Sequence, residues 1–116
     1  LGIVCDAATT PGRILRELLA ADGLLGFFVP EALSFSDETG HCKPRPQAFQ
    51  RALDGLGLPP AQVAHVGDIP RTDIAGARAA GLKAVRFAGV DDRTEDPQAD
   101  AVVRDHRELL PLLAGW

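Results

Sequence analysis

The 116-residue chain has no methionine, only two cysteines and no long apolar run. A helix that crosses a bilayer needs about 20 consecutive apolar residues, and a secretory signal needs a basic segment followed by an apolar core. We therefore expect no membrane partner and a cytoplasmic location. Cys5 and Cys42 lie far apart without a paired spacing, which argues against a disulfide framework or a zinc ribbon.

An excess of positive charge is also missing. The chain has 12 Lys and Arg residues against 16 Asp and Glu residues, a formal net charge of -4, and its basic residues are scattered. Nucleic-acid-binding domains gather basic residues on one face, so we expect no nucleic-acid partner. A hydrophobic content of 46% and a charged content of 24% are typical of one globular domain.

The first residues already follow a strand pattern. Residues 1–5 form an apolar run rich in β-branched side chains, as in a strand buried on both faces, and no methionine or leading segment precedes them. We therefore expect a further segment upstream. Residues 1–116 are predicted to form a single domain that is incomplete at its N-terminus, because the length cannot accommodate a complete enzyme with a lid domain.

Strand and helix patterns alternate along the chain. The predicted strands span residues 1–5, 32–36, 63–66, 83–87 and 101–103, and the predicted helices span residues 11–22, 46–56, 72–80 and 107–113. Alternation of this kind predicts parallel pairing, right-handed crossovers and an open α/β sheet with helices on both faces. Ligands of such sheets bind at the carboxyl ends of the strands. The polar residues there are Cys5, Asp6, Ser36, Asp37, Asp68 and Asp73.

Two carboxylates lie five residues apart where the third predicted strand meets its helix. Asp68 ends the strand and Asp73 falls in the first turn of the helix, so both can face one pocket. Hard oxygen ligands at a strand end suit Mg²⁺, which takes one or two carboxylates from protein and keeps its waters. The alternative interpretation makes Asp73 an acid that stabilises the helix N-terminus and Asp68 the first residue of a turn.

Lys43 favours the metal and phosphate interpretation. It is one of two lysines in the chain, and Pro44 and Pro46 stiffen the backbone beside it just before a helix. An ammonium held in place beside Mg²⁺ stabilises phosphoryl oxygens in a transition state. The alternative is a solvated lysine on a proline-rich turn.

These motifs together resemble the haloacid dehalogenase superfamily of phosphohydrolases. Residues 43–49 (KPRPQAF) are similar to its third motif, and residues 66–73 (VGDIPRTD) with 75–81 (AGARAAG) to its fourth. Residues 1–6 resemble the second motif, and residues 24–43 the segment that links the second and third. The resemblance implies a Rossmann-like three-layer α/β/α core with a mostly parallel sheet. It also implies Mg²⁺-dependent hydrolysis of a small phosphorylated metabolite through an aspartyl-phosphate.

The resemblance assigns a role to each matching residue. Lys43 would contact the nucleophile and the phosphate, and Asp68 would ligate Mg²⁺. Asp73 would hold the metal site through water or hydrogen bonds. Lys43, Asp68 and Asp73 are therefore the principal site residues that the sequence predicts.

Cys5 stands where the family has a serine or threonine hydroxyl that donates to the phosphate. A thiol is a weaker donor than a hydroxyl. The backbone N–H groups of Asp6 and Ala7 could still donate to the phosphate. The alternative interpretation of Cys5 is a small buried apolar residue at a strand end.

The chain departs from the family at its first motif. The nucleophile of the family is the first Asp of an Asp-x-Asp pair after a central strand, and these 116 residues contain no such pair. The acidic run 91–96 is interpreted as a solvated turn. Without the central strand, the strands on either side would leave a gap of about 10 Å. We expect the chain alone to be inactive, and either a missing N-terminal segment or another copy to fill the gap, or else the flanking strands to pair directly.

Two other interpretations of the chain are open. A degenerate scaffold could serve as a non-catalytic binding or assembly module, and a flavodoxin-like nucleotide or receiver domain shares the α/β alternation. His65 is predicted to be a hydrogen-bonded core histidine, because His41, Cys42, Cys5 and His65 fit no common metal spacing. Residues 109–113 and Trp116 are predicted to cover the domain's own core.

Overall fold

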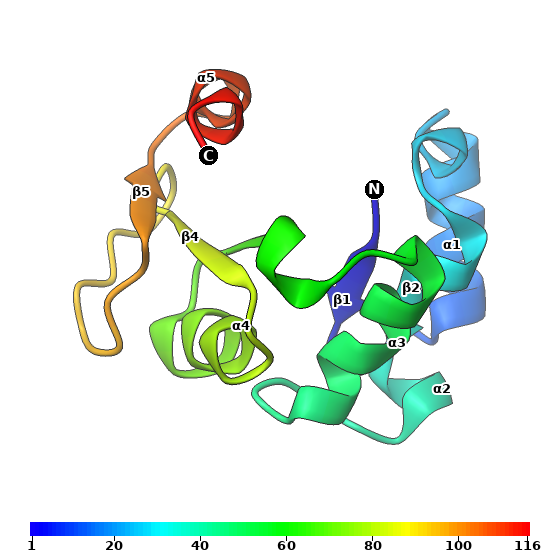
Figure 1. Ribbon diagram of the computed structural model, residues 1–116. Helices are drawn as coiled ribbons and strands as arrows, with labels where there is room; N and C mark the ends of the chain where they lie inside the picture. The colour runs from blue at the N-terminus through cyan, green and yellow to red at the C-terminus, as the bar shows by residue number, and fades with distance from the viewer.

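The computed structural model describes all 116 residues and alternates short strands with helices (Figure 1). The strands are β1 (Ile3–Cys5), β2 (Leu33–Phe35), β3 (Ala64–Gly67), β4 (Lys83–Phe87) and β5 (Ala101–Val103). The α-helices are α1 (Gly12–Ala21), α2 (Ser36–Thr39), α3 (Pro46–Leu56), α4 (Ala75–Ala79) and α5 (Leu109–Ala114). None of these helices combines the length and apolar character that a membrane span requires.

All strand pairs are parallel, but the strands form two sheets rather than one. One sheet has the order β1-β2 and the other the order β3-β4-β5. Ile3 lies opposite Leu33 in the first sheet, and His65 lies opposite Ala84 in the second. The predicted α/β class with parallel pairing is therefore confirmed. β1 and β3, the strands on either side of the gap, do not pair with each other. The expected alternative of direct pairing is therefore wrong.

A gap with apolar walls separates the two sheets. Its volume is about 800 Å³, and its walls include Gly2 and Val4 on one side and Ala64 and Val66 on the other. β1 and β3 each pair with only one neighbour, so each has one backbone edge without a partner strand. Both strands are accordingly half-buried, whereas all three residues of β2 are buried. The predicted burial of residues 1–5 on both faces is thus only partly reached.

The main apolar core lies where α3, which packs on β1 and β2, meets α4, which packs on β4. It includes Phe49 and Leu53 from α3 and Ala77 from α4, all of them buried. Gly76 contributes by having no side chain, because a Cβ there would overlap the ring of Phe49. This close approach explains why small residues dominate the third predicted helix, residues 72–80.

The start of α4 differs from the sequence prediction. Helical structure was predicted from residue 72, but a wide π turn covers Pro70–Ile74 before α4 begins. Pro70 opens this turn, where its lack of an N–H costs nothing, and the N–H of Asp73 bonds to the carbonyl of Ile69 at 2.8 Å. The turn directs Asp73 into the protein instead of along the helix surface.

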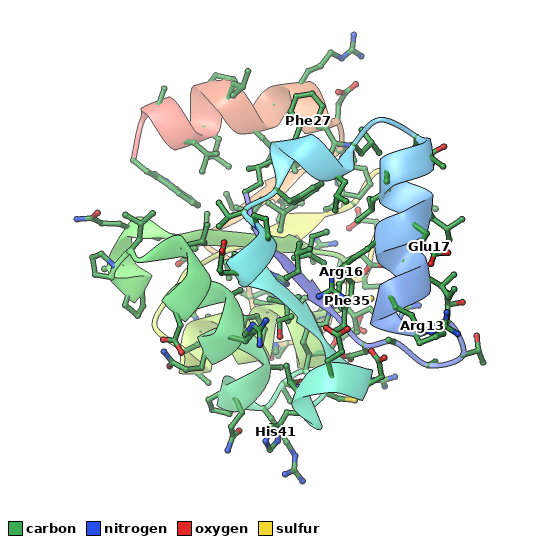
Figure 2. All side chains as sticks on the ribbon, turned by 90° about the vertical axis from the view of Figure 1, so that its right-hand side faces the viewer. Arg13, Arg16, Glu17, Phe27, Phe35 and His41 are labelled. Atoms are coloured by element: carbon green, nitrogen blue, oxygen red, sulfur yellow. The ribbon has the colours of Figure 1, made fainter.

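The outer sides of the two sheets differ in how helices cover them. α1 packs beside the β1-β2 sheet, where the Arg16 guanidinium lies 4.8 Å from the centre of the Phe35 ring and bonds to Glu38 (Figure 2). α5 lies beyond the other sheet, next to the C-terminus (Figure 1). The prediction that residues 109–113 and Trp116 cover the domain's own core is wrong, because no residue of α5 is buried and Leu110 is 79% exposed. Leu113 and Trp116 instead line part of the gap.

Gly55 should be intolerant of a side chain although it lies in a helix. Alanine would normally stabilise a helix interior by about 1 kcal/mol relative to glycine. A Cβ at position 55, however, would overlap the backbone of Glu31 and Ala32. We expect Gly55→Ala to lower the free energy of unfolding by about 1–3 kcal/mol in urea titrations, since the backbone must shift.

Gly26→Ala provides the matched control for that measurement. A Cβ at position 26 would meet no heavy atom within 4 Å, so its effect should stay within about 0.5 kcal/mol. A Gly55→Ala variant that is as stable as the wild type would contradict the close packing of α3 on the turn before β2.

Candidate functional site

The carboxyl ends of β1 and β2 are joined by hydrogen bonds between the segments that follow them. The backbone N–H of Ala7 donates to the Ser36 hydroxyl oxygen at 2.8 Å. The N–H of Gly12, at the start of α1, donates to the carboxylate of Asp37. The segment after β1 is therefore fixed by two side chains that follow β2, as parallel pairing of the two strands allows.

Lys43 joins this region to the second sheet. Its backbone N–H donates to Asp6 Oδ1 at 2.9 Å, and its Nζ lies 2.7 Å from Asp73 Oδ1. The Lys43 side chain is 15% exposed and that of Asp73 only 4% exposed. Lys43 is thus not the solvated surface lysine of the alternative interpretation. Its ammonium is held in place by an ion pair with a buried carboxylate.

Asp73 accepts hydrogen bonds from three different segments of the chain. Besides Lys43 Nζ, His65 Nε2 on β3 lies 2.9 Å from Oδ1, and the N–H of Ile69 lies 3.1 Å from Oδ2. Burial by itself would raise the pKa of the Asp73 carboxyl. The hydrogen bonds from His65 and Lys43, the positive charge of Lys43 and the Ile69 N–H outweigh burial and hold that pKa well below its usual range.

Gly67 makes room for this carboxylate. A Cβ on Gly67, the last residue of β3, would overlap the side chain of Asp73. The glycine of the fourth motif is therefore required by the close approach of a buried acid, and not by an unusual backbone angle. The end of β3 therefore needs a glycine at position 67, to make room for Asp73, and a hydrogen-bonding side chain at position 65.

Asp68 differs from Asp73 in its surroundings. It follows β3 directly, is exposed, and its carboxylate has no hydrogen bond or ion pair within the chain. It lines a pocket of about 340 Å³ with Phe87, Asp91 and His106, and Asp73 does not line that pocket. The structure thus brings Lys43 and Asp73 into contact, whereas the Asp68 carboxylate forms no hydrogen bond or ion pair with either of them. No three His, Cys, Asp or Glu side chains are grouped so as to hold a metal ion.

Cys5 lies half-buried at the end of β1. Burial raises the pKa of its thiol, although the nearby charge of Lys43 acts in the opposite direction. The thiol is therefore protonated at neutral pH and can act only as a weak donor.

Asp6 and Ala7 have contacts that the sequence did not predict. The Asp6 carboxylate accepts the N–H of Lys43, and the Ala7 N–H is already bonded to Ser36. The expectation that the Ala7 N–H is available to a phosphate does not match this arrangement, because its donor capacity is taken within the chain.

His65 is the residue whose importance the sequence analysis missed. It was predicted to be a hydrogen-bonded core histidine, and the hydrogen bond is confirmed, but its partner is the site residue Asp73. Its ring also meets the edge of Phe49, with ring centres 5.1 Å apart. The two-residue period of a strand places His65 on the same face as Gly67. This spacing was the signal in the sequence that could have placed His65 near the site.

Ionisation of Asp73 should stabilise the fold above about pH 4. Because the pKa of Asp73 is lower in the folded chain than the value of about 3.9 in the unfolded chain, this stabilisation is lost as the pH falls below 4. At about pH 7, Asp73→Asn should lower the free energy of unfolding by about 1–3 kcal/mol, measured by urea unfolding. The difference from wild type should shrink at about pH 3.

Asp54→Asn is the control for this comparison. Asp54 lies exposed on α3, where its carboxylate accepts a hydrogen bond from Gln50. Its substitution should change the free energy of unfolding by less than about 0.5 kcal/mol. An Asp73→Asn effect of the same size at both pH values would rule out a stabilising role for the ionised carboxylate.

Comparison with known proteins identifies the family of the chain. The family model of the haloacid dehalogenase-like hydrolases matches residues 1–81, which is more than half of the chain. A phosphoserine phosphatase of Thermus thermophilus is 42% identical over 97 residues, covering 82% of this chain and 38% of that protein. A glyceraldehyde 3-phosphate phosphatase of Methanopyrus kandleri is 33% identical over 113 residues, covering 91% of this chain and 48% of that protein.

A solved structure of a HAD phosphatase from Thermococcus onnurineus superposes with a TM-score of 0.80 at 30% identity, covering 94% of this chain and 49% of that one. The chain therefore spans less than half the length of these three proteins. The family model and the parallel α/β fold lead to the same assignment. The chain belongs to the haloacid dehalogenase-like hydrolases.

Proposed function

We propose that this chain is the core portion of a Mg²⁺-dependent phosphatase that acts on a small phosphorylated metabolite. In this proposal the attacking carboxylate comes from an Asp outside the 116 residues. The single observation that carries the proposal is the Lys43 ammonium, held 2.7 Å from the buried Asp73 carboxylate at the carboxyl end of the sheet. The names of the relatives, a phosphoserine phosphatase and a glyceraldehyde 3-phosphate phosphatase, support the substrate class.

Lys43 would bind the phosphoryl group of the substrate. Its ammonium has three N–H donors, and one of them is used by Asp73. The others can donate to phosphoryl oxygens. Because Pro44, the Asp6 hydrogen bond and the Asp73 ion pair hold the residue at both ends, little reorganisation is needed when negative charge develops in the transition state.

Asp68 would be the part of the metal site that this chain supplies. Its carboxylate is exposed and has no partner, so its oxygens remain free to ligate a hard cation. The Oδ1 and Oδ2 atoms of Asp73 already accept three hydrogen bonds, so Asp73 would act through water or through Lys43. When bound, Mg²⁺ would add positive charge next to the phosphoryl oxygens. The Asp68 carboxylate fits Mg²⁺, which prefers oxygen ligands. It supplies only one of the protein ligands, so the remaining ligands would come from outside these residues.

The gap between β1 and β3 supports a nucleophile from another segment. A strand placed there would pair with the free edges of both strands at the usual spacing of about 4.8 Å and would cover apolar walls. If this strand ran parallel to both neighbours, as every strand pair within the chain does, its carboxyl end would lie between Cys5 on one side and Gly67 on the other. An Asp following that strand would reach the region of Lys43. We propose that an N-terminal segment of a longer protein supplies this strand.

Complementation should restore activity to the chain. The 116 residues alone should hydrolyse p-nitrophenyl phosphate at a negligible rate, and adding an N-terminal segment with an apolar strand and an Asp-x-Asp pair should produce Mg²⁺-dependent turnover. Lys43→Met in the complemented protein should lower kcat by about 100-fold or more, because it removes the charge that stabilises the phosphoryl oxygens.

Two controls accompany this assay. A segment in which the first Asp of the pair is replaced by Asn should still bind to the 116-residue chain but should not produce turnover of p-nitrophenyl phosphate. Rapid hydrolysis by the 116 residues alone would refute the external nucleophile, and full activity of Lys43→Met would refute the role of the lysine.

Mg²⁺ should bind at Asp68 in the chain itself. In ¹H–¹⁵N NMR titrations with MgCl₂ and inorganic phosphate, the backbone signals of residues 67–69 should shift. Asp68→Asn should abolish these shifts, because it removes the free carboxylate. Asp22→Asn, which changes an exposed acid at the end of α1, should leave them intact. Absence of any shift in the wild type would favour a non-catalytic binding module.

A further inference from the structure

We propose that His65 is a positioning residue that holds the Asp73 carboxylate and, through it, the Lys43 ammonium. The consequence for catalysis rests on the proposed function, in which Lys43 binds the phosphoryl group. The geometric part does not, since it concerns only contacts within the chain. His65 Nε2 and Lys43 Nζ bond to the same carboxylate oxygen, Oδ1 of Asp73, at 2.9 and 2.7 Å.

The chemistry of the acceptor determines which ring nitrogen of His65 carries hydrogen. An ionised carboxylate can only accept hydrogen bonds, and the charge-assisted bonds hold Asp73 in its ionised form. Nε2 must therefore be the protonated nitrogen that donates to Oδ1. The N–H of Ile69 donates to Oδ2, so both carboxylate oxygens have a donor from a rigid part of the chain.

Without His65, the restraint on Oδ1 would come from Lys43 alone. A lysine side chain has four rotatable bonds and binds as a mobile point charge. Its ammonium therefore cannot fix the direction of the carboxylate by itself. His65, with a short side chain on a paired strand, gives Oδ1 a fixed donor, as the Ile69 N–H does for Oδ2.

The His65 ring is itself fixed on several sides. Its backbone lies in β3 opposite Ala84, and its ring meets the edge of the fully buried Phe49 at an interplanar angle of 81°. Its side chain is 12% exposed. A ring held by a strand at one end and by an aromatic contact at the other keeps Nε2 directed at Asp73.

His65 also lines the gap between β1 and β3. A strand that fills the gap would cover the exposed edge of the ring and exclude water from the Asp73 hydrogen bonds. Exclusion of water strengthens such bonds, because the local dielectric constant falls. Completion of the sheet and placement of Lys43 are thereby linked through one side chain.

Two substitutions separate positioning from packing. His65→Leu keeps an apolar contact with Phe49 but removes the donor to Asp73. His65→Gln keeps a donor, its side-chain amide nitrogen, and should therefore rescue the contact. His106→Leu is the matched control, because it removes a histidine ring that stacks on Phe87 and does not touch Asp73.

The first measurement uses the 116-residue chain and the ¹⁵N signal of the Lys43 side-chain ammonium in NMR. In the wild type this signal should be protected from exchange and coupled to the Asp73 carboxylate. We expect His65→Leu to lose the protection by about tenfold or more, with His65→Gln and His106→Leu close to wild type. An unchanged Lys43 signal in folded His65→Leu would overturn the inference, as would its loss in His106→Leu.

The second measurement uses the complemented protein and separates this inference from the proposed function. His65→Leu should lower kcat by about 10- to 100-fold with little change in KM, and His65→Gln should recover most of the loss, because a misplaced charge acts mainly on the transition state. If the wild type turns over substrate and His65→Leu has the same kcat, the inference fails while the proposed function stands. If the wild type has no activity but His65→Leu still releases Lys43, the proposed function fails and the geometric inference stands.

Discussion

The buried carboxylate of Asp73 is the group on which the arrangement of the site depends. Its residue is only 3% exposed, and an ionised group in such a place is costly unless charged and polar donors surround it. Lys43, His65 and Ile69 supply those donors from a loop, a strand and a turn. Three segments that are separate in the sequence must therefore converge on one point. Gly67 makes that convergence sterically possible.

Lys43 has a second structural consequence, because it links two sheets that share no hydrogen bonds. Its backbone N–H bonds to Asp6 after β1, and its side chain bonds to Asp73 before α4. The carboxyl ends of the two sheets are thus connected through a single residue. The strands themselves remain apart, with apolar walls of about 800 Å³ between them. The two sheets therefore have a polar connection at their carboxyl ends and an apolar gap between β1 and β3.

Local patterns predicted most of the fold, and they were wrong where tertiary contacts dominated. Strands such as β3 and β4 were predicted within one residue, because short β-branched runs between glycines are distinctive. Leu110 and Trp116 were expected to pack on the core because they are apolar, but α5 lies on the surface beside the gap. Apolar character shows that burial of a residue would be favourable. It does not show whether another part of the chain lies where it can bury that residue.

The candidate site was predictable as a set of residues but not as a set of contacts. Lys43, Asp68 and Asp73 could be found in the sequence, because rigid prolines, strand-end acids and a glycine have recognisable spacings. The sequence alone thus determined the α/β class and the family, and it predicted the chemical type of the site. Only the tertiary structure decided that Asp73 is buried against Lys43 and His65 while Asp68 remains exposed. Burial and hydrogen-bond partners depend on which distant segments meet, and a short-range pattern carries no information about that.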